Sequence, residues 1–232
     1  LATTTGSNNV GVGRSALQVN STGDNNSALG RNALLNNTTA DANTAVGHAA
    51  LQENTTGTGN VAVGVGSSDA STTGDNNVAV GNGALGSDTR GNFSTAIGHA
   101  ALNSQNTTND TNMHNTGVGY LAGVAVTTGV GNTFLGSTAG QAVTTGDDNT
   151  FIGFTTGAYQ GNLTTGHYNT IIGAYSTTTA VSSDLAAGLG YNLNCEGGYT
   201  TLGNGGSDIR AAHGNVTWAT VSDERYKKDI TD

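Results

Sequence analysis

The chain has 232 residues, of which 34% are hydrophobic and 5% aromatic, and it contains 37 glycines but no proline. Its net charge of −9 disfavours a protein that binds nucleic acid or another polyanion. Its single cysteine, Cys195, excludes an intrachain disulfide and a cysteine-based metal site. No segment is apolar over the length that a membrane-spanning helix requires, so we expect no membrane insertion.

A glycine recurs with a constant step of 17 from Gly13 to Gly98 (30 − 13 = 17) and continues with steps of 21, 17, 17, 20, 15 and 15 to Gly203. A fixed period of this size, with insertions that do not reset it, is typical of a solenoid. We therefore predict an all-β fold, a parallel β-roll or β-solenoid of about twelve short coils. These block glycines are Gly13, Gly30, Gly47, Gly64, Gly81, Gly98, Gly119, Gly136, Gly153, Gly173, Gly188 and Gly203.

Each coil is predicted to contain two strands separated by turns. Glycines seven positions before the block glycine, such as Gly6 and Gly23, are expected to supply positive φ angles. An asparagine follows them, and stacked asparagines are expected to form a hydrogen-bonded ladder along the axis. The ladder asparagines are Asn9, Asn26, Asn43, Asn60, Asn77, Asn115, Asn132, Asn149 and Asn169.

The first strand of each coil is apolar at neighbouring positions. The residue directly before the block glycine is aliphatic from Val12 to Ile172, and we assign it to the core. The residue before that is small in the early coils. It becomes large at Phe134, Phe151 and Ile171. Because neighbouring strand residues face opposite ways, the strand is apolar on both faces, and we expect a second chain to cover one of them.

The second predicted strand changes where the phenylalanines enter. A leucine at one position, as at Leu34 and Leu102, gives way to Gly123, Gly140 and Gly157. The middle residue of the first strand becomes large in the same coils in which the leucine position becomes glycine, so the summed side-chain volume stays roughly constant. We therefore predict that the two positions share one filled space, either within one chain or across chains.

The repeat N-x-A-V-G, seen as NTAVG at residues 43–47, is sustained from about Gly6 to Gly173. This pattern resembles the head repeat of trimeric autotransporter (YadA-like) adhesins, whose heads are trimers of parallel β-rolls. The resemblance implies a homotrimer. The coil of this chain, with its period of 17, is longer than the usual head coil.

The run SDERYKKDI, from Ser222 to Ile230, resembles the opening motif of the endosialidase-type intramolecular chaperone. That family is a self-cleaving trimerisation domain at the ends of phage tail fibres and tailspikes. The resemblance implies that Ser222 is the nucleophile, Lys227 its base and Val221–Ser222 the scissile bond. The family's domain extends for about a hundred residues, whereas this sequence ends at Asp232, soon after Ser222, so we expect no enzymatic activity.

Two insertions, at residues 103–114 and 158–163, are expected to protrude as loops. The first is the candidate receptor-binding loop, and its candidate binding residues are Asn103, Asn106, Asn109, Asp110 and His114. We divide the chain into a repetitive shaft or head (residues 1–175), tapering coils or a neck (176–212) and the truncated start of the chaperone region (213–232).

Three further sets of residues have two interpretations each. The residues that directly follow the block glycines form a column that could bind acidic sugars, although a solvent-facing column without function is favoured. Threonine pairs such as Thr38–Thr39 suggest ice binding, but a structural role in the coil is favoured. Asp24, Asp75, Asp147 and Asp148 are better explained by turn formation than by calcium binding. The column comprises Arg14, Arg31, His48, Val65, Asn82, His99 and Tyr120.

Together these patterns predict a structural and receptor-binding segment of a trimeric phage tail fibre. Its expected partners are a host-surface glycan or protein receptor and other tail proteins. Its expected location is the virion or a cell surface, with no metal and no cofactor. A bacterial cell-surface trimeric adhesin and an ice-binding β-solenoid are the alternatives.

Overall fold

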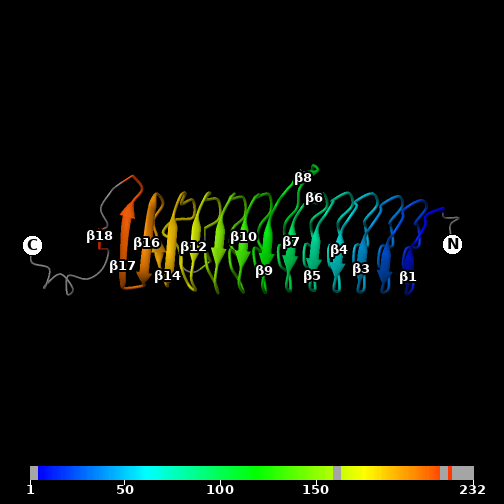
Figure 1. Ribbon diagram of the computed structural model, residues 1–232, viewed down its shortest axis with the longest axis horizontal. Helices are drawn as coiled ribbons and strands as arrows, with labels where there is room; N and C mark the ends of the chain where they lie inside the picture. Colours follow the sequence, from blue (N-terminus) through cyan, green and yellow to red (C-terminus); the bar gives the residue numbers. More distant parts are fainter. Residues whose placement is uncertain (1–4, 159–162, 215–218, 221–232) are drawn as a thin grey trace, which may run out of the picture.

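The computed structural model describes residues 5–158, 163–214 and 219–220. These residues contain strands and turns but no helix, and they form one long, narrow rod with the first and last strands of the sheet at opposite ends (Figure 1). The central part of the predicted loop 158–163 lies outside the described residues. Its flanking residues, Ala158 and Leu163, are buried.

One 14-stranded sheet runs along the rod. Among the described strands, β17 pairs antiparallel with β16 and with β18, and the twelve strands from β1 to β16 (14 − 2) stack in parallel and bound eleven turns, which confirms the parallel β-solenoid. Its strands are β1 (Val10–Val12), β2 (Ser27–Leu29), β3 (Thr44–Val46), β4 (Val61–Val63), β5 (Val78–Val80), β7 (Thr95–Ile97), β9 (Thr116–Val118), β10 (Thr133–Leu135), β11 (Thr150–Ile152), β12 (Thr170–Ile172), β14 (Ala187–Tyr191), β16 (Tyr199–Asn204), β17 (Ser207–Ala212) and β18 (Ala219–Thr220).

Most coils contain one strand, so the prediction of two strands per coil is wrong. The segment assigned to the second strand is a series of turns in which Leu34 and Leu51 both have a φ of 49°. Left-handed residues of this kind interrupt an extended run. The other strands form two separate pairs of short strands: β6 (Gly91–Asn92) with β8 (Thr111–Asn112), and β13 (Thr177–Thr178) with β15 (Asn194–Cys195).

Two sets of glycines serve the stacking in different ways. Block glycines such as Gly47, with a φ of 136°, have the positive φ angle that favours glycine. Gly23 and its equivalents do not, so the expectation of positive φ there is wrong. At Gly23 the reason for glycine is close approach, because a Cβ would clash with the carbonyl oxygen of Ala40 in the next coil.

The face of the stacked strands that points inward is the opposite of the face that we assigned to the core from sequence. The small central residues, such as Ala45 and Ala62, are fully buried. The aliphatic residues that precede the block glycines point outward. Val12 is 55% exposed and Leu29 52%, so their assignment to the core is wrong for the single chain.

The phenylalanine position of the strand and the leucine or glycine position of the following turn share a space inside one chain. Phe134 and Phe151 are fully buried, and their ring centroids lie 5.9 Å apart. A Cβ added at Gly140 would clash with the Phe134 ring, and one at Gly157 would clash with the Phe151 ring. The predicted shared space is therefore confirmed, and it lies within the coil stack of a single chain.

The asparagine ladder is confirmed as the second internal element. In a typical step, the Asn132 side-chain Nδ2 donates to the Gly146 carbonyl (2.8 Å), and its Oδ1 accepts a bond from the Asn149 backbone N–H (3.0 Å). Asn132 and Asn149 are fully buried. Each buried amide thus bonds two backbone groups of the next coil, which fixes the register of the stack.

The stack continues beyond Gly173 through β14 and β16. In β14, Gly188 pairs with Ile171, so its assignment as a block glycine is wrong, and Gly190 takes that position. The stack ends where β16 turns back into the antiparallel strand β17. This hairpin pairs one side of β16, so that end of the parallel sheet is covered by a strand of the same chain (Figure 1).

Candidate functional site

The insertion after β7 protrudes over a shorter length than residues 103–114. Gln105 and Met113 are fully buried and belong to the coil interior. Its exposed residues are Asn106, Thr108–Asp110, Asn112 and His114, and the tip formed by Asn106 and Thr108–Asp110 projects beside β6 and β8 (Figure 1). The insertion therefore presents a short polar tip on a base that is part of the core.

Two of the five predicted binding residues meet at one corner of the coil stack. The Asn106 Oδ1 accepts a hydrogen bond from the Thr89 hydroxyl (3.0 Å). The Asp110 carboxylate accepts one from the Thr73 hydroxyl (2.9 Å) and lies 3.7 Å from Arg90 Nη1. These contacts hold the insertion against the two preceding coils.

The other three predicted residues make different contacts. Asn103 Nδ2 donates to the Gly83 carbonyl (2.7 Å), and the Asn109 carbonyl accepts from the Thr107 hydroxyl within the insertion (2.9 Å). The exposed His114 ring stacks on Phe93, with centroids 5.4 Å apart and planes 7° apart. The five residues thus do not form one compact cluster, and their role in binding stays a prediction.

A buried polar network lies beneath the insertion. Ser94 occupies a ladder position that asparagine holds in the neighbouring coils, and Gln105 replaces the missing amide by accepting from Asn115 Nδ2 (2.9 Å). Gln105 also donates to the Ser94 hydroxyl and to the Asp88 carboxylate. Burial raises the pKa of the Asp88 carboxyl, and the hydrogen bonds from Gln105 and the Gly91 N–H oppose that rise.

Asp88 and Gln105 were not predicted as a buried network from the sequence. Two signals could have found them: the absence of a ladder asparagine at Ser94, and the longer step of 21 that follows Gly98 (119 − 98 = 21). This coil is the least regular part of the interior, because Ser94 replaces a ladder asparagine and the Asp88 carboxyl is buried. A buried carboxyl is costly unless it is hydrogen-bonded. Its contacts are internal to the stack, which indicates a structural role in supporting the insertion.

The column of residues that directly follow the block glycines lies in the turns after the strands. From sequence, this column was predicted either to face solvent without a function or to bind acidic sugars. All seven of its residues are exposed. The column continues beyond Tyr120, through Ser137, to the exposed side chains of Phe154 and Tyr191, which the sequence analysis did not include. Within it, His99 stacks on Tyr120 with ring centroids 5.4 Å apart.

The aspartates and the threonine pairs act in stacking. The Asp24 Oδ1 accepts from the Ser7 N–H (2.6 Å) and the Asp75 Oδ1 from the Thr58 N–H (2.6 Å), each in the preceding coil. Thr38 donates its hydroxyl to the Thr55 carbonyl (3.0 Å) of the next coil. Over the described ranges, no three His, Cys, Asp or Glu side chains come together in an arrangement suited to a metal ion.

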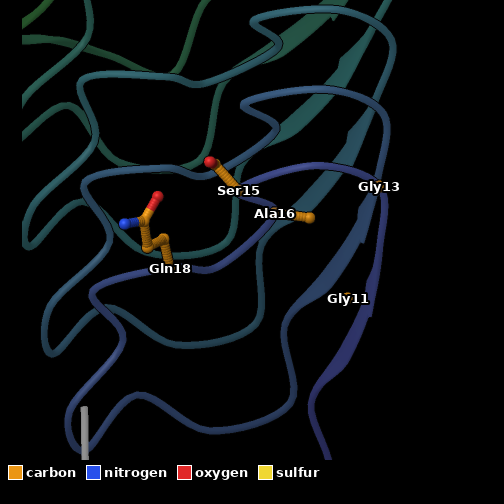
Figure 2. Close-up of a pocket in the computed structure, with 5 residues that line it drawn as sticks. All are labelled: Gly11, Gly13, Ser15, Ala16 and Gln18. Atoms are coloured by element: carbon orange, nitrogen blue, oxygen red, sulfur yellow. The ribbon is translucent and has the colours of Figure 1, made fainter. Parts of the chain in front are cut away.

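A hollow opens at the first coil, lined by Gly11, Gly13, Ser15, Ala16 and Gln18 (Figure 2). None of these side chains is ionisable at neutral pH. In the next coil, Ala33 and Leu34 are fully buried, whereas the equivalent Ala16 and Leu17 are only partly buried. The hollow is therefore the uncovered end of the stack, without the groups that general acid–base chemistry requires.

The candidate autocleavage residues Ser222 and Lys227 lie outside the described residues. A comparison with known protein families, curated protein sequences and solved structures finds no match. In the part of the chain with described coordinates, no helix has the length and apolar character needed to cross a bilayer. A functional assignment therefore depends on the surface of the rod and on the sequence motifs.

Proposed function

We propose that the chain is a rod segment of a homotrimeric fibre, and that the rod holds receptor-binding surfaces away from the particle or cell that carries it. The observation that carries this proposal is the outward face of the sheet, formed by the first and third residues of the parallel strands from β1 to β14 and, in β16, by Thr200 and Leu202, which pair with Ala187 and Leu189. Aliphatic side chains on this face, such as Val12, Leu29 and Leu189, are more than half exposed in the single chain.

The composition of the outward face supports burial in an assembly. None of its 24 positions (2 × 12) carries a charged residue: one row of this face, which ends at Thr200, holds Thr, Val, Ser or Ala, and the other row, which ends at Leu202, holds Val, Leu or Ile. Twelve strands at a spacing of about 4.8 Å make this face roughly 53 Å long. Large exposed apolar patches mark interaction sites, and the centres of interfaces are depleted of charge.

The number of chains and the biological context come from the two sequence resemblances. The coil repeat resembles trimeric adhesin heads, and the Ser222–Ile230 run resembles the start of a chaperone that registers three chains of a phage fibre. We therefore favour a phage tail fibre that attaches to a host surface, with a bacterial adhesin as the alternative.

Charge on the outward face tests the assembly. Val63→Lys together with Val80→Lys places two cations in the middle of the proposed interface and should reduce the mass in solution to that of one chain. The matched control places lysines at the exposed corner residues Thr56 and Thr145. Light scattering distinguishes the outcomes, and an equal mass for both double variants would contradict the proposal.

Removal of the polar tip tests the attachment role. Deleting residues 107–110 returns the step between Gly98 and Gly119 to the regular value (119 − 98 − 4 = 17). We expect unchanged assembly and melting temperature with loss of binding to host cells, measured with labelled protein on a panel of bacteria. Retained binding by the deletion variant would exclude the tip as the receptor contact.

The ice-binding alternative has one observation in its favour. Threonine occupies the first position of six of the parallel strands from β3 to β12, beside an outward aliphatic residue: Thr44, Thr95, Thr116, Thr133, Thr150 and Thr170. A flat array of this kind is compatible with ice only if no other chain covers it. An ice-recrystallisation assay on the purified protein separates the two functions.

A further inference from the structure

One long edge of the rod lies at the arrowhead ends of the parallel strands (Figure 1). The residue types at this edge change along the axis. At the N-terminal end it carries Arg14, Arg31 and His48, one in each successive coil. Further along, it carries aromatic rings. We call the part formed by His99, Tyr120, Phe154, Tyr175 and Tyr191 the aromatic edge.

The rings of the aromatic edge contact one another in two groups and are not buried. Tyr120 is 53% exposed, Phe154 48% and Tyr191 53%. Phe154 packs edge-on against Tyr175 with centroids 5.3 Å apart, and Tyr175 packs edge-on against Tyr191 at 5.8 Å. Phe154, Tyr175 and Tyr191 therefore form a continuous file along the axis, and the stacked pair of His99 and Tyr120 precedes it, with Ser137 in the intervening coil.

Folding of the coils does not require these rings. The turn position of Tyr120, Phe154 and Tyr191 is held by Arg14 and Asn82 in other coils, so the backbone accepts different side chains there. The chain has only twelve aromatic residues (4 Phe, 7 Tyr and 1 Trp), and four of them lie on this edge. Tyrosine and other aromatic side chains are enriched where proteins recognise ligands, because they offer rigid area at a small entropic cost.

We propose that the aromatic edge binds an uncharged linear polysaccharide that lies parallel to the rod axis. From β7 to β14 the edge crosses five strand spacings, about 24 Å, which is long enough for several sugar units. The apolar faces of pyranose rings would pack on the exposed aromatic rings, and the tyrosine hydroxyls and turn carbonyls would meet the sugar hydroxyls.

The shape and charge of the edge favour this ligand over other polymers. A file one side chain wide cannot provide the roughly 800 Å² per partner of a stable protein–protein interface. The net charge of −9 opposes nucleic acids and acidic glycans. A neutral extended chain meets neither obstacle.

This inference rests on the proposed attachment role, but its test has a separate readout. The assembled full-length protein is run in affinity electrophoresis through gels containing mannan, β-glucan or galactan, with hyaluronate as the acidic comparison. We expect retardation by at least one neutral polysaccharide. The triple variant Tyr120→Ala, Phe154→Ala, Tyr191→Ala should weaken that binding by at least about tenfold, with the mass in solution and the melting temperature unchanged.

The matched control substitutes the exposed rings of the opposite edge, Phe93→Ala and Tyr168→Ala, and should retain binding. The proposal would be overturned by the absence of binding to all neutral polysaccharides, by equal binding of the triple variant, or by binding to hyaluronate alone. Failure of the proposed fibre role would instead appear as a single-chain mass, which the gels do not report.

Discussion

The coils on either side of Ser94 share one backbone but are filled in different ways. The earlier coils combine a small strand residue with a buried leucine, as in Ala45 and Leu51, and add a second column of buried asparagines at Asn20, Asn37 and Asn54. The later coils combine Phe134 or Phe151 with glycine and place apolar residues in that second column: Val126, Val143 and Leu163. The comparison teaches that the coil shape is set by the elements common to both halves, the block glycines and the first asparagine ladder.

Between the two halves, the second column passes through Ser71, Asp88 and Gln105. These residues are neither a complete ladder nor an apolar core. Asn54 Oδ1 is buried and has no hydrogen-bond partner among the described residues, because Ser71 is too short to continue the ladder. The transition coils should therefore be the least stable part of the rod interior.

The largest effect should come from removing a phenylalanine of the later half. Phe134→Ala leaves a cavity beside Gly123 and Gly140, and we expect it to reduce the free energy of unfolding by about 3–5 kcal/mol. Urea unfolding followed by circular dichroism measures the change. An unchanged unfolding midpoint would show that the ring does not fill the core.

Conversion of one later coil to the earlier type sharpens that test. Gly140→Leu alone should destabilise the protein, because its Cβ would clash with the Phe134 ring. In the Phe134→Ala background, the same leucine should restore stability, since Leu102 is accommodated at the equivalent position with a φ of 50°. Additive effects of the two changes in a double-mutant cycle would contradict a shared space.

The first ladder should be equally important in both halves. Asn132→Ala leaves the Gly146 carbonyl and the Asn149 N–H without their bonds, and each buried group left unpaired costs about 1–3 kcal/mol. Asn43→Ala, in the earlier half, should cost a similar amount. The exposed Asn82→Ala is the control and should stay within about 0.5 kcal/mol of wild type. A much smaller loss at Asn43 than at Asn132 would break the comparison between the halves.

The transition coils can be stabilised by completing the second column. Ser71→Asn with Asp88→Asn supplies a donor for Asn54 Oδ1 and removes a buried carboxyl, and we expect a gain of about 1 kcal/mol at pH 7. A carboxyl whose pKa is raised on folding stabilises the protein below its unfolded pKa, and this contribution is lost as the pH rises through the folded pKa. The advantage of Asp88→Asn should thus disappear on acidification. A gain that is constant from pH 3 to pH 8 would contradict a raised pKa at Asp88.

The smallest effect concerns the shorter coils near the C-terminus. Burial raises the pKa of the Cys195 thiol to about 12. The folded protein should therefore react with iodoacetamide at pH 8 far more slowly than the urea-unfolded chain, as followed by mass spectrometry. Equal rates would show that these coils open more readily than the rest of the rod.

Sequence periodicity was sufficient to predict the solenoid, the asparagine ladder and the exchange between Phe134 and Gly140. Each follows from a residue type that recurs at one position of the coil. The direction of the strand faces could not be predicted, because Ala45 and Val46 are both apolar and alternation alone does not say which one points inward. The second strand was predicted wrongly because Leu51 reads as a strand residue, although packing holds it in a left-handed conformation. The network at Asp88 depends on contacts between coils that no single coil reveals.

The central claim is that the outward faces of three chains cover one another. Sedimentation equilibrium of the purified protein at micromolar concentration tests it directly. The account predicts a mass three times that of one chain, whereas a folded species of 23.0 kDa would contradict it.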